Sequence, residues 1–295
     1  LGLGYCPNAG IPAVRESIAQ YLSKQQELEL KAKDVVMTVG AASALVDFFR
    51  ATVEPGDEII VPSPYFVEYG NYCGHFGGVL KPVETNEDFS LNIEAIEEAI
   101  TSKTRAIIVN SPNNPTGAIY SENELRALAA LIDKINLERE KVTGARALFL
   151  LSDEPYRVFA YDGVEVPPVL PMTKYAIVLG SFSKTLSMAG ERVGYLAINP
   201  KLSEEDGGTL LTTLILVNRT LGYVNAPVIG QKLAAAICNE TVDLEIYARR
   251  RALMAKVLTD AGVEFIMPKG AFYFFPKAPG GDDTKFVDAL LKERI

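Results

Sequence analysis

The chain has 295 residues, of which 48% are hydrophobic, and its formal net charge is −8 with a pI near 5.0. This length and apolar content allow a large core, while the acidic balance argues against nucleic acid or an anionic membrane as a partner. Three scattered cysteines and a single histidine predict neither a disulfide framework, a metal site nor a histidine-based triad. No apolar run reaches the length of a membrane span, so we expect a cytoplasmic protein.

Helical and apolar segments alternate from Pro12 to Ile198. An amphipathic helix is predicted first, over Pro12–Leu30. Further helices are predicted at Ala42–Thr52, Asn92–Ile100 and Ser121–Asn136, with a helical stretch between the second and third strands. The predicted strands are Val35–Thr38, Glu58–Val61, Val79–Pro82, Ala106–Val109, Ala147–Leu151, Ala176–Leu179 and Val193–Ile198. Short buried strands that alternate with helices predict an α/β fold, a three-layer α/β/α domain around a mostly parallel sheet.

A smaller α+β domain is expected after this alternation ends. One long helix is predicted over Ala235–Leu258, followed by strands at Val263–Ile266 and Ala271–Phe275. We therefore predict a large domain over residues 1–238, and a connecting helix with the start of a small domain over residues 239–295. Both ends of the sequence are abrupt, so we expect an N-terminal segment and the rest of the small domain to lie outside it.

Two turns rich in small residues follow predicted strands. In the first, Gly40, Ala41 and Ala42 precede a helix, where backbone N–H groups could approach an anion. The second runs from Asn110 to Gly117 and contains Asn114, whose amide can both donate and accept hydrogen bonds. The second turn could also be an ordinary strand-to-helix connection with Ser121 as the helix cap.

Asp153 follows the apolar stretch Ala147–Leu151. A carboxylate at the end of a buried strand is unfavourable unless a cation or a hydrogen-bond donor faces it. A pyridinium N–H is such a partner, and Tyr156 could reach an oxygen of the same ring. The alternative is that Asp153 caps a helix.

Lys184 lies in the sequence Ser181-Phe182-Ser183-Lys184, where an apolar run stops, and Arg192 follows eight positions later. A lysine presented from a tight turn behind a buried strand can be partly desolvated, which favours an amine able to form a Schiff base with a carbonyl. On its own the motif is weak, because most lysines in such loops are solvated.

Together these segments supply a lysine for an aldehyde, a carboxylate for a ring nitrogen, an amide and a phenol for a ring oxygen, and a phosphate cradle. This set suits pyridoxal 5'-phosphate (PLP). The chain resembles the fold type I PLP-dependent enzymes, and within them the class I/II aminotransferases of the aspartate aminotransferase superfamily, from Tyr5 almost to its end. The resemblance implies a PLP-dependent transferase-like fold and ping-pong transfer of an amino group between an L-amino acid and a 2-oxo acid.

The resemblance also implies a role for each motif residue. Lys184 forms the Schiff base and moves the substrate's proton, Asp153 pairs with the ring nitrogen, and Asn114 and Tyr156 bind the ring's 3-oxygen. The phosphate would be bound by two backbone N–H groups, two hydroxyls and a guanidinium, those of Ala41, Ala42, Ser181, Ser183 and Arg192.

Aromatic residues complete the implied site. Phe66 resembles the aromatic that lies on the ring face, with Tyr65 as the alternative. Tyr5 matches the tyrosine that reaches the phosphate in the neighbouring subunit of a homodimer. Arg219 could bind a second substrate carboxylate or be a solvated charge at a helix end, and the arginine for the α-carboxylate is expected beyond Ile295.

Other activities are compatible with the same cofactor residues, because the orientation of the substrate above the ring decides which bond breaks. One is a PLP-dependent C–S β-lyase, or an enzyme resembling aminocyclopropane-carboxylate synthase. Another, from a different class, is the PLP-sensing domain of a transcription regulator. The acidic balance of the chain weighs against the regulator.

Overall fold

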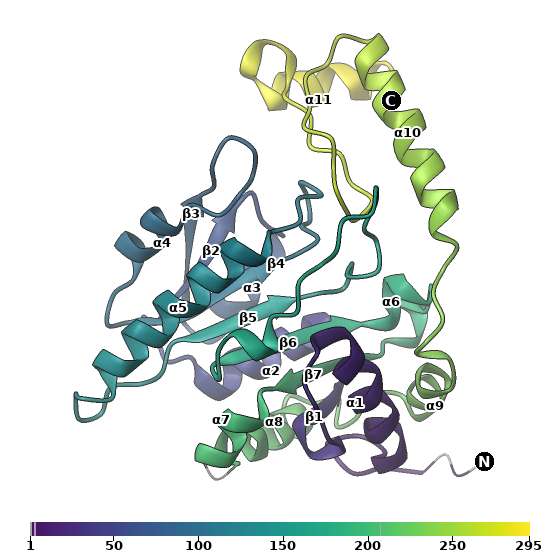
Figure 1. The fold of residues 1–295 in the computed structure, drawn as a ribbon. Coiled ribbons are helices and arrows are strands. Elements are labelled where there is room, and N and C mark those ends of the chain that lie inside the picture. Colours follow the sequence, from purple (N-terminus) through teal and green to yellow (C-terminus); the bar gives the residue numbers. More distant parts are fainter. Residues whose placement is uncertain (1, 3, 207) are drawn as a thin grey trace.

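The structure is a computed structural model and describes residue 2, residues 4–206 and residues 208–295. In this part of the chain, seven strands form one sheet in the order β1-β7-β6-β5-β4-β2-β3, and helices cover both of its faces (Figure 1). The strands are β1 (Val35–Thr38), β2 (Glu58–Ser63), β3 (Val79–Glu84), β4 (Thr104–Asn110), β5 (Phe149–Asp153), β6 (Ala176–Ser181) and β7 (Gly194–Ile198). The predicted α/β fold is therefore confirmed.

Strand direction decides which residues share an edge of the sheet. β7 is antiparallel to β1 and to β6, whereas the β2–β3, β2–β4, β4–β5 and β5–β6 pairs are parallel. All strands except β7 therefore end at one edge, and β7 begins there. The register places Gly194, at the start of β7, opposite both Thr38 and Ser181.

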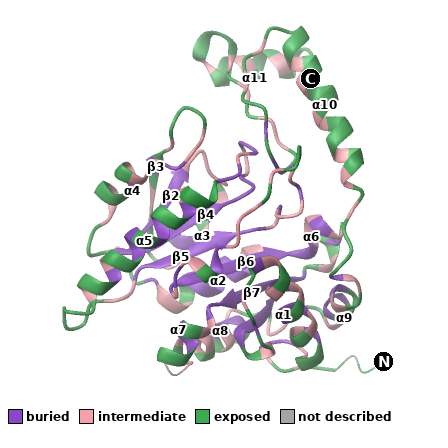
Figure 2. Ribbon diagram, in the orientation of Figure 1, coloured by how far each residue is buried: buried purple, intermediate pink, exposed green. Residues whose placement is uncertain are grey.

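Every residue of β4, β5, β6 and β7 is buried, as Figure 2 shows for the centre of the sheet. Strands covered on both faces consist of apolar residues without alternation, which explains their continuous hydrophobic runs. The covering helices are α1 (Pro12–Gln26), α2 (Ala41–Thr52), α3 (Glu68–Gly74), α4 (Ile93–Ala99), α5 (Glu122–Arg139), α7 (Pro200–Glu205), α8 (Thr209–Thr220) and α9 (Val228–Ile237).

Two predicted helices have different bounds in the structure. α1 ends at Gln26 and not at Leu30, because Glu27 adopts a left-handed conformation with φ 49°. The single helix predicted over Ala235–Leu258 is wrong: α9 ends at Ile237 and α10 (Leu244–Asp260) begins separately. The Asp243 side chain accepts a hydrogen bond from Glu245 N at 3.0 Å and starts α10, as an N-cap does.

The strands predicted at Val263–Ile266 and Ala271–Phe275 are also wrong. Within the described residues the first segment forms a single bridge, Phe265–Pro276, and the second forms none, although the neighbouring Gly270 forms one bridge with Ala160. Their segment instead returns toward the sheet between α10 and α11 (Asp283–Lys292), which stand away from it (Figure 1). Gly270 N donates to Gly117 O at 2.8 Å and Ala271 N donates to Phe159 O at 2.9 Å, so the backbone is paired with loops rather than with a strand.

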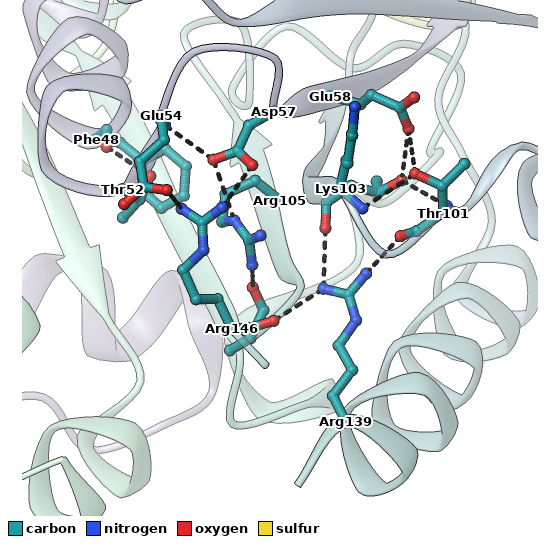
Figure 3. Close-up of polar contacts among 12 residues, drawn as sticks. Phe48, Thr52, Glu54, Asp57, Glu58, Thr101, Lys103, Arg105, Arg139 and Arg146 are labelled. Carbon is teal, nitrogen blue, oxygen red and sulfur yellow. Dashed lines mark hydrogen bonds and ion pairs between the residues drawn. The ribbon is translucent and has the colours of Figure 1, made fainter. Parts of the chain in front are cut away.

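The edge where β2, β4 and β5 begin carries a cluster of charged residues (Figure 3). Arg146 donates to Asp57 Oδ1 at 2.6 Å, and Glu54 N donates to Asp57 Oδ2 at 2.8 Å. Arg105 lies 3.6 Å from the same carboxylate and donates to Ala147 O at 3.0 Å. Arg139 donates to three backbone carbonyls, those of Thr101, Thr104 and Arg146.

Among the residues that the structure describes, no helix combines the length and apolar content needed to span a bilayer.

Candidate active site

The opposite edge of the sheet, where every strand except β7 ends, borders a cavity of about 200 Å³. Ten of the sequence-predicted site residues line it. Five are those expected around a ring: Phe66, Asn114, Asp153, Tyr156 and Lys184. The other five are those expected around a phosphate: Ala41, Ala42, Ser181, Ser183 and Arg192.

Asp153 is the last residue of β5 and is buried. The hydroxyl of Tyr69 donates to its Oδ2 at 2.6 Å, whereas Oδ1 has no hydrogen-bond partner among the described residues. Burial raises the pKa of Asp153 to about 7; the Tyr69 hydrogen bond acts against this increase and the charge of Glu154 adds to it. Turns rather than a helix follow β5, so Asp153 is not a helix cap.

The Asn110–Gly117 turn is fixed against the end of β5. Asn110, the last residue of β4, donates from Nδ2 to Asp153 O at 2.8 Å, and its Oδ1 accepts from Asn114 N at 2.6 Å. The turn therefore holds Asn114 beside Asp153. Ser121 caps α5 as expected, accepting from Glu124 N at 3.3 Å.

Tyr156 lines the same cavity. Its hydroxyl is 2.6 Å from the hydroxyl of Tyr273, and burial, followed by this hydrogen bond, raises its pKa above the ordinary value. Tyr273 comes from the segment that returns to the sheet between α10 and α11. Residues from the predicted second domain thus contact the site.

Lys184 is presented by the short helix α6 (Phe182–Thr185), which follows β6 directly. The Phe182 side chain is buried and its N–H donates to Val193 O at 3.1 Å, which anchors the turn to the sheet. Lys184 is only partly buried, and its Nζ lies 6.0 Å from the centroid of the Phe272 ring.

The predicted anion site combines the start of α2 with Arg192. Gly40 precedes α2 with φ 85°, and a Cβ atom built on it would lie 2.7 Å from Arg192 Nη2. Arg192 Nη1 donates to Ala189 O at 2.9 Å and lies 3.5 Å from Ser183 Oγ. The N–H groups of the first turn of α2 have no helical acceptors and carry partial positive charge. Together these groups form a cationic cradle of the kind that binds phosphate.

Three predictions concern Tyr5, the choice between Phe66 and Tyr65, and Arg219. Tyr5 does not line the cavity in the described chain and is 95% exposed. Between Phe66 and Tyr65, only Phe66 is among the described lining residues. Arg219 is exposed near the end of α8, which agrees with a solvated charge.

Sequence reasoning missed Tyr69, Phe272 and Tyr273. Tyr69 gives no local signal, because an aromatic in a short helix next to a strand is most simply a core residue. Phe272 and Tyr273 belong to the aromatic run from Phe272 to Phe275, which was interpreted as a strand. Their approach to Lys184 and Tyr156 depends on tertiary contacts far apart in the sequence.

Comparison with known proteins agrees with this site. The family model for aminotransferase class I and II matches residues 2–295. A probable aspartate/prephenate aminotransferase of Aquifex aeolicus is 33% identical over 98% of this chain and 73% of the relative. Aromatic-amino-acid aminotransferase 2 of Thermococcus litoralis is 32% identical, and the match covers 98% of this chain and 73% of that relative. The crystal structure of an aminotransferase from Eubacterium rectale superposes with a TM-score of 0.93 and 36% identity, covering 99% of this chain and 72% of that one.

The fold and the matches define the class: the chain belongs to the class I and II aminotransferase family. It is a PLP-dependent aminotransferase, which transfers an amino group between an amino acid and a 2-oxo acid.

The residues around the cavity fit PLP on structural grounds. The free Oδ1 of Asp153 can accept a hydrogen bond from a ring N–H, and the cradle around Gly40 and Arg192 suits a phosphate. An amine that can condense with an aldehyde, Lys184, lines the same cavity.

Proposed function

We propose that this cavity is the transamination site of the chain, with Lys184, Asp153 and Tyr156 as its catalytic residues. The observation that supports this most directly is the buried Oδ1 of Asp153, which has no partner in the described chain and belongs to a cavity that Lys184 also lines. An unpaired buried carboxylate oxygen is unfavourable, so a ligand with a donor is expected there. PLP, when bound, supplies an electron sink for the breaking of a bond at the substrate's α-carbon.

Each residue then acts on a defined part of the ligand. Asp153 pairs with the ring nitrogen and keeps it protonated. Asn114 and Tyr156 bind the 3-oxygen, and Phe66 packs on the ring face. Lys184 would hold the aldehyde group and, as a free amine, would move a proton to and from the substrate's α-carbon. The phosphate is bound by the N–H groups of Ala41 and Ala42, the hydroxyls of Ser181 and Ser183, and the guanidinium of Arg192.

The cradle also orients the reaction. A guanidinium presents paired N–H donors in a fixed plane, so Arg192 fixes the phosphate more firmly than a lysine would. A phosphate bound at the start of α2 would help to hold the ligand in the cavity that Phe66, Asp153 and Lys184 also line. The centroid of the Phe272 ring lies 6.0 Å from Lys184 Nζ, close enough for the ring to interact with the protonated amine.

For substrates, we propose aspartate as the first amino donor to test, with a 2-oxo acid as acceptor. Relatives are named as acting on aspartate and prephenate, and one as acting on aromatic amino acids. A panel of acidic, aromatic and aliphatic donors with 2-oxoglutarate would identify the preferred class. Release of pyruvate and ammonia from cystathionine without an acceptor would support the lyase alternative instead.

We further propose a homodimer in which Tyr5 reaches the neighbouring site. Tyr5 is 95% exposed, and the N-terminal segment lies beside α9, where Lys232 Nζ donates to Gly2 O at 3.2 Å. Exposed apolar residues of α8 and α9, Leu216, Ile229 and Leu233, provide a surface for a second copy. Sedimentation of the protein as a monomer would contradict this. The division into domains over residues 1–238 and 239–295, and a cytoplasmic location, belong to the same proposal.

The test of the proposed function is covalent labelling. PLP added to the purified protein, followed by borohydride, should attach one PLP to Lys184, as peptide mass spectrometry would show. Attachment to other lysines with Lys184 unmodified would contradict the proposal. The Lys174→Ala variant is a matched control, because Lys174 lies at the opposite edge of the sheet and pairs with Glu205 at 2.6 Å.

A further inference from the structure

The two carboxylate oxygens of Asp153 have different surroundings. Oδ2 accepts a hydrogen bond from Tyr69 at 2.6 Å, and Oδ1 is free among the described residues. We propose that Tyr69 is a positioning residue that keeps the Asp153 carboxylate charged and directs its free oxygen to the ring nitrogen of PLP. This inference rests on the proposed function of the cavity.

Tyr69 is held rigidly enough for this role. It lies in α3, is 0% exposed, and its ring packs edge-on against Phe66 at 5.4 Å between centroids. Asp153 is restrained from the other side, since Asn110 Nδ2 donates to its backbone oxygen. With one carboxylate oxygen and the backbone both fixed, the direction of Oδ1 is fixed as well.

The other groups around Asp153 do not replace Tyr69. Glu154, the next residue, adds negative charge, but its Oε2 is 2.9 Å from Arg157 Nη1. The phenols of Tyr72, Tyr156 and Tyr195 are close enough to interact electrostatically, and Lys184 and Arg192 line the same cavity. In the described part of the chain, Tyr69 is the side chain that donates a hydrogen bond to this carboxylate.

The sign of the effect follows from burial. Burial raises the pKa of Asp153 to about 7, and the Tyr69 hydrogen bond works in the opposite direction. The Tyr69→Phe substitution removes the donor and keeps the ring, so the pKa of Asp153 should rise further, on the order of one pH unit. Below this higher pKa, Asp153 is neutral and cannot form an ion pair with a protonated ring nitrogen.

The experiment compares the PLP dissociation constants of Tyr69→Phe and wild type at pH 6 and at pH 9. The dissociation constant of Tyr69→Phe should be about tenfold larger than that of wild type at pH 6. At pH 9 the two constants should be nearly equal, because Asp153 is charged in both proteins. The ratio of the two constants cancels every pH effect that the two proteins share, including the titration of PLP itself. A ratio equal at both pH values would overturn the proposal, since a purely structural defect weakens binding at every pH.

Two variants serve as controls. Tyr175→Phe removes a buried phenol that donates to Glu140 at 2.9 Å at the opposite edge of the sheet, and should give a ratio of one at both pH values. In an Asp153→Asn background, Tyr69→Phe should no longer have a pH-dependent effect. A pH-dependent effect that persists there would show that Tyr69 acts through another group.

A second readout needs no PLP. In the PLP-free protein, Tyr69→Phe should lower the urea midpoint more at pH 9, where Asp153 is charged, than at pH 5. An equal change at both values would contradict the coupling between Tyr69 and Asp153. If wild type fails to bind PLP, the proposed function is wrong, and this stability measurement still decides whether the two residues act together.

Discussion

The two edges of the sheet each carry a buried carboxylate, and the two carboxylates differ in how many donors and cations surround them. At the edge where β2 and β4 begin, Asp57 accepts from Arg146 and from Glu54 N and lies 3.6 Å from Arg105. At the edge where β5 ends, Asp153 accepts from Tyr69 alone among described side chains, and its Oδ1 has no partner there.

The pKa values of these carboxyls differ accordingly. Burial acts to raise the pKa of Asp57, but the Glu54 N–H and the two arginines outweigh it, and the pKa lies below its ordinary value. Burial raises the pKa of Asp153 to about 7. The charge on Asp57 therefore stabilises the folded chain, whereas the charge on Asp153 destabilises it until a cationic partner is bound.

The largest expected effect is on Lys184. Lys184→Ala should lower transamination by more than about a thousand-fold, because in the proposed function the amine both holds the cofactor and transfers the proton. The unfolding free energy should change little, since Lys184 is only partly buried and forms no ion pair within the described chain. Donor-dependent formation of 2-oxo acid measures the loss, and activity near that of wild type would remove Lys184 from the mechanism.

Substitution at the opposite edge should affect stability instead. Asp57→Asn leaves Arg105 and Arg146 without their carboxylate, and should lower the unfolding free energy by about 3 kcal/mol at pH 7. The stabilisation from Asp57 is present above a pH of about 4 and is lost as the pH falls through its lowered pKa. Urea unfolding measures this change. The activity per folded molecule should stay the same, and a fall in it would show that the two edges are not independent.

Asp153→Asn should separate stability from activity. At pH 8 the PLP-free variant should be more stable than wild type, on the order of 2 kcal/mol, because the buried charge is removed. Its transamination should fall by about a hundred-fold. The neighbouring substitution Glu154→Gln is the control, and it should destabilise the protein because Glu154 is paired with Arg157. A loss of stability in both variants would contradict the account, in which the charge of Asp153 is unpaired and that of Glu154 is paired.

The smallest effect is expected for Arg192→Lys. A lysine cannot reproduce the paired donors of a guanidinium, so PLP should bind about tenfold more weakly. Arg146→Lys, at the other edge, should leave the PLP dissociation constant unchanged. Spectrophotometric titration of both variants measures the difference. If Arg192→Lys bound PLP as tightly as wild type, the proposal that Arg192 binds the phosphate would be contradicted.

Much of this arrangement could be predicted from the sequence, for a physical reason. Strands that are buried on both faces leave continuous apolar runs, and the polar residue that ends each run lies at the shared edge of a parallel sheet. By this logic, Gly40, Asn114, Asp153 and Lys184, which each follow or end an apolar run, are expected at one edge. β7 brings Arg192 there as well, because it is antiparallel and begins at that edge.

The rest depends on contacts that local patterns do not record. The break between α9 and α10 follows from the Asp243 cap within an otherwise helical sequence. Tyr69 reaches Asp153 across 84 positions of sequence. The hydroxyls of Tyr273 and Tyr156 lie 2.6 Å apart, and the adjacent Gly270 and Ala271 donate to Gly117 O and Phe159 O in loops far away in the sequence.

The most direct test of the contrast between the edges is the unfolding free energy of wild type between pH 5 and pH 9, with and without PLP. Without PLP, stability should fall as the pH rises toward about 7, because Asp153 becomes charged in a buried site. With PLP bound, this fall should disappear, since the ring nitrogen provides the missing partner. The same pH dependence in both states would contradict the role assigned to Asp153.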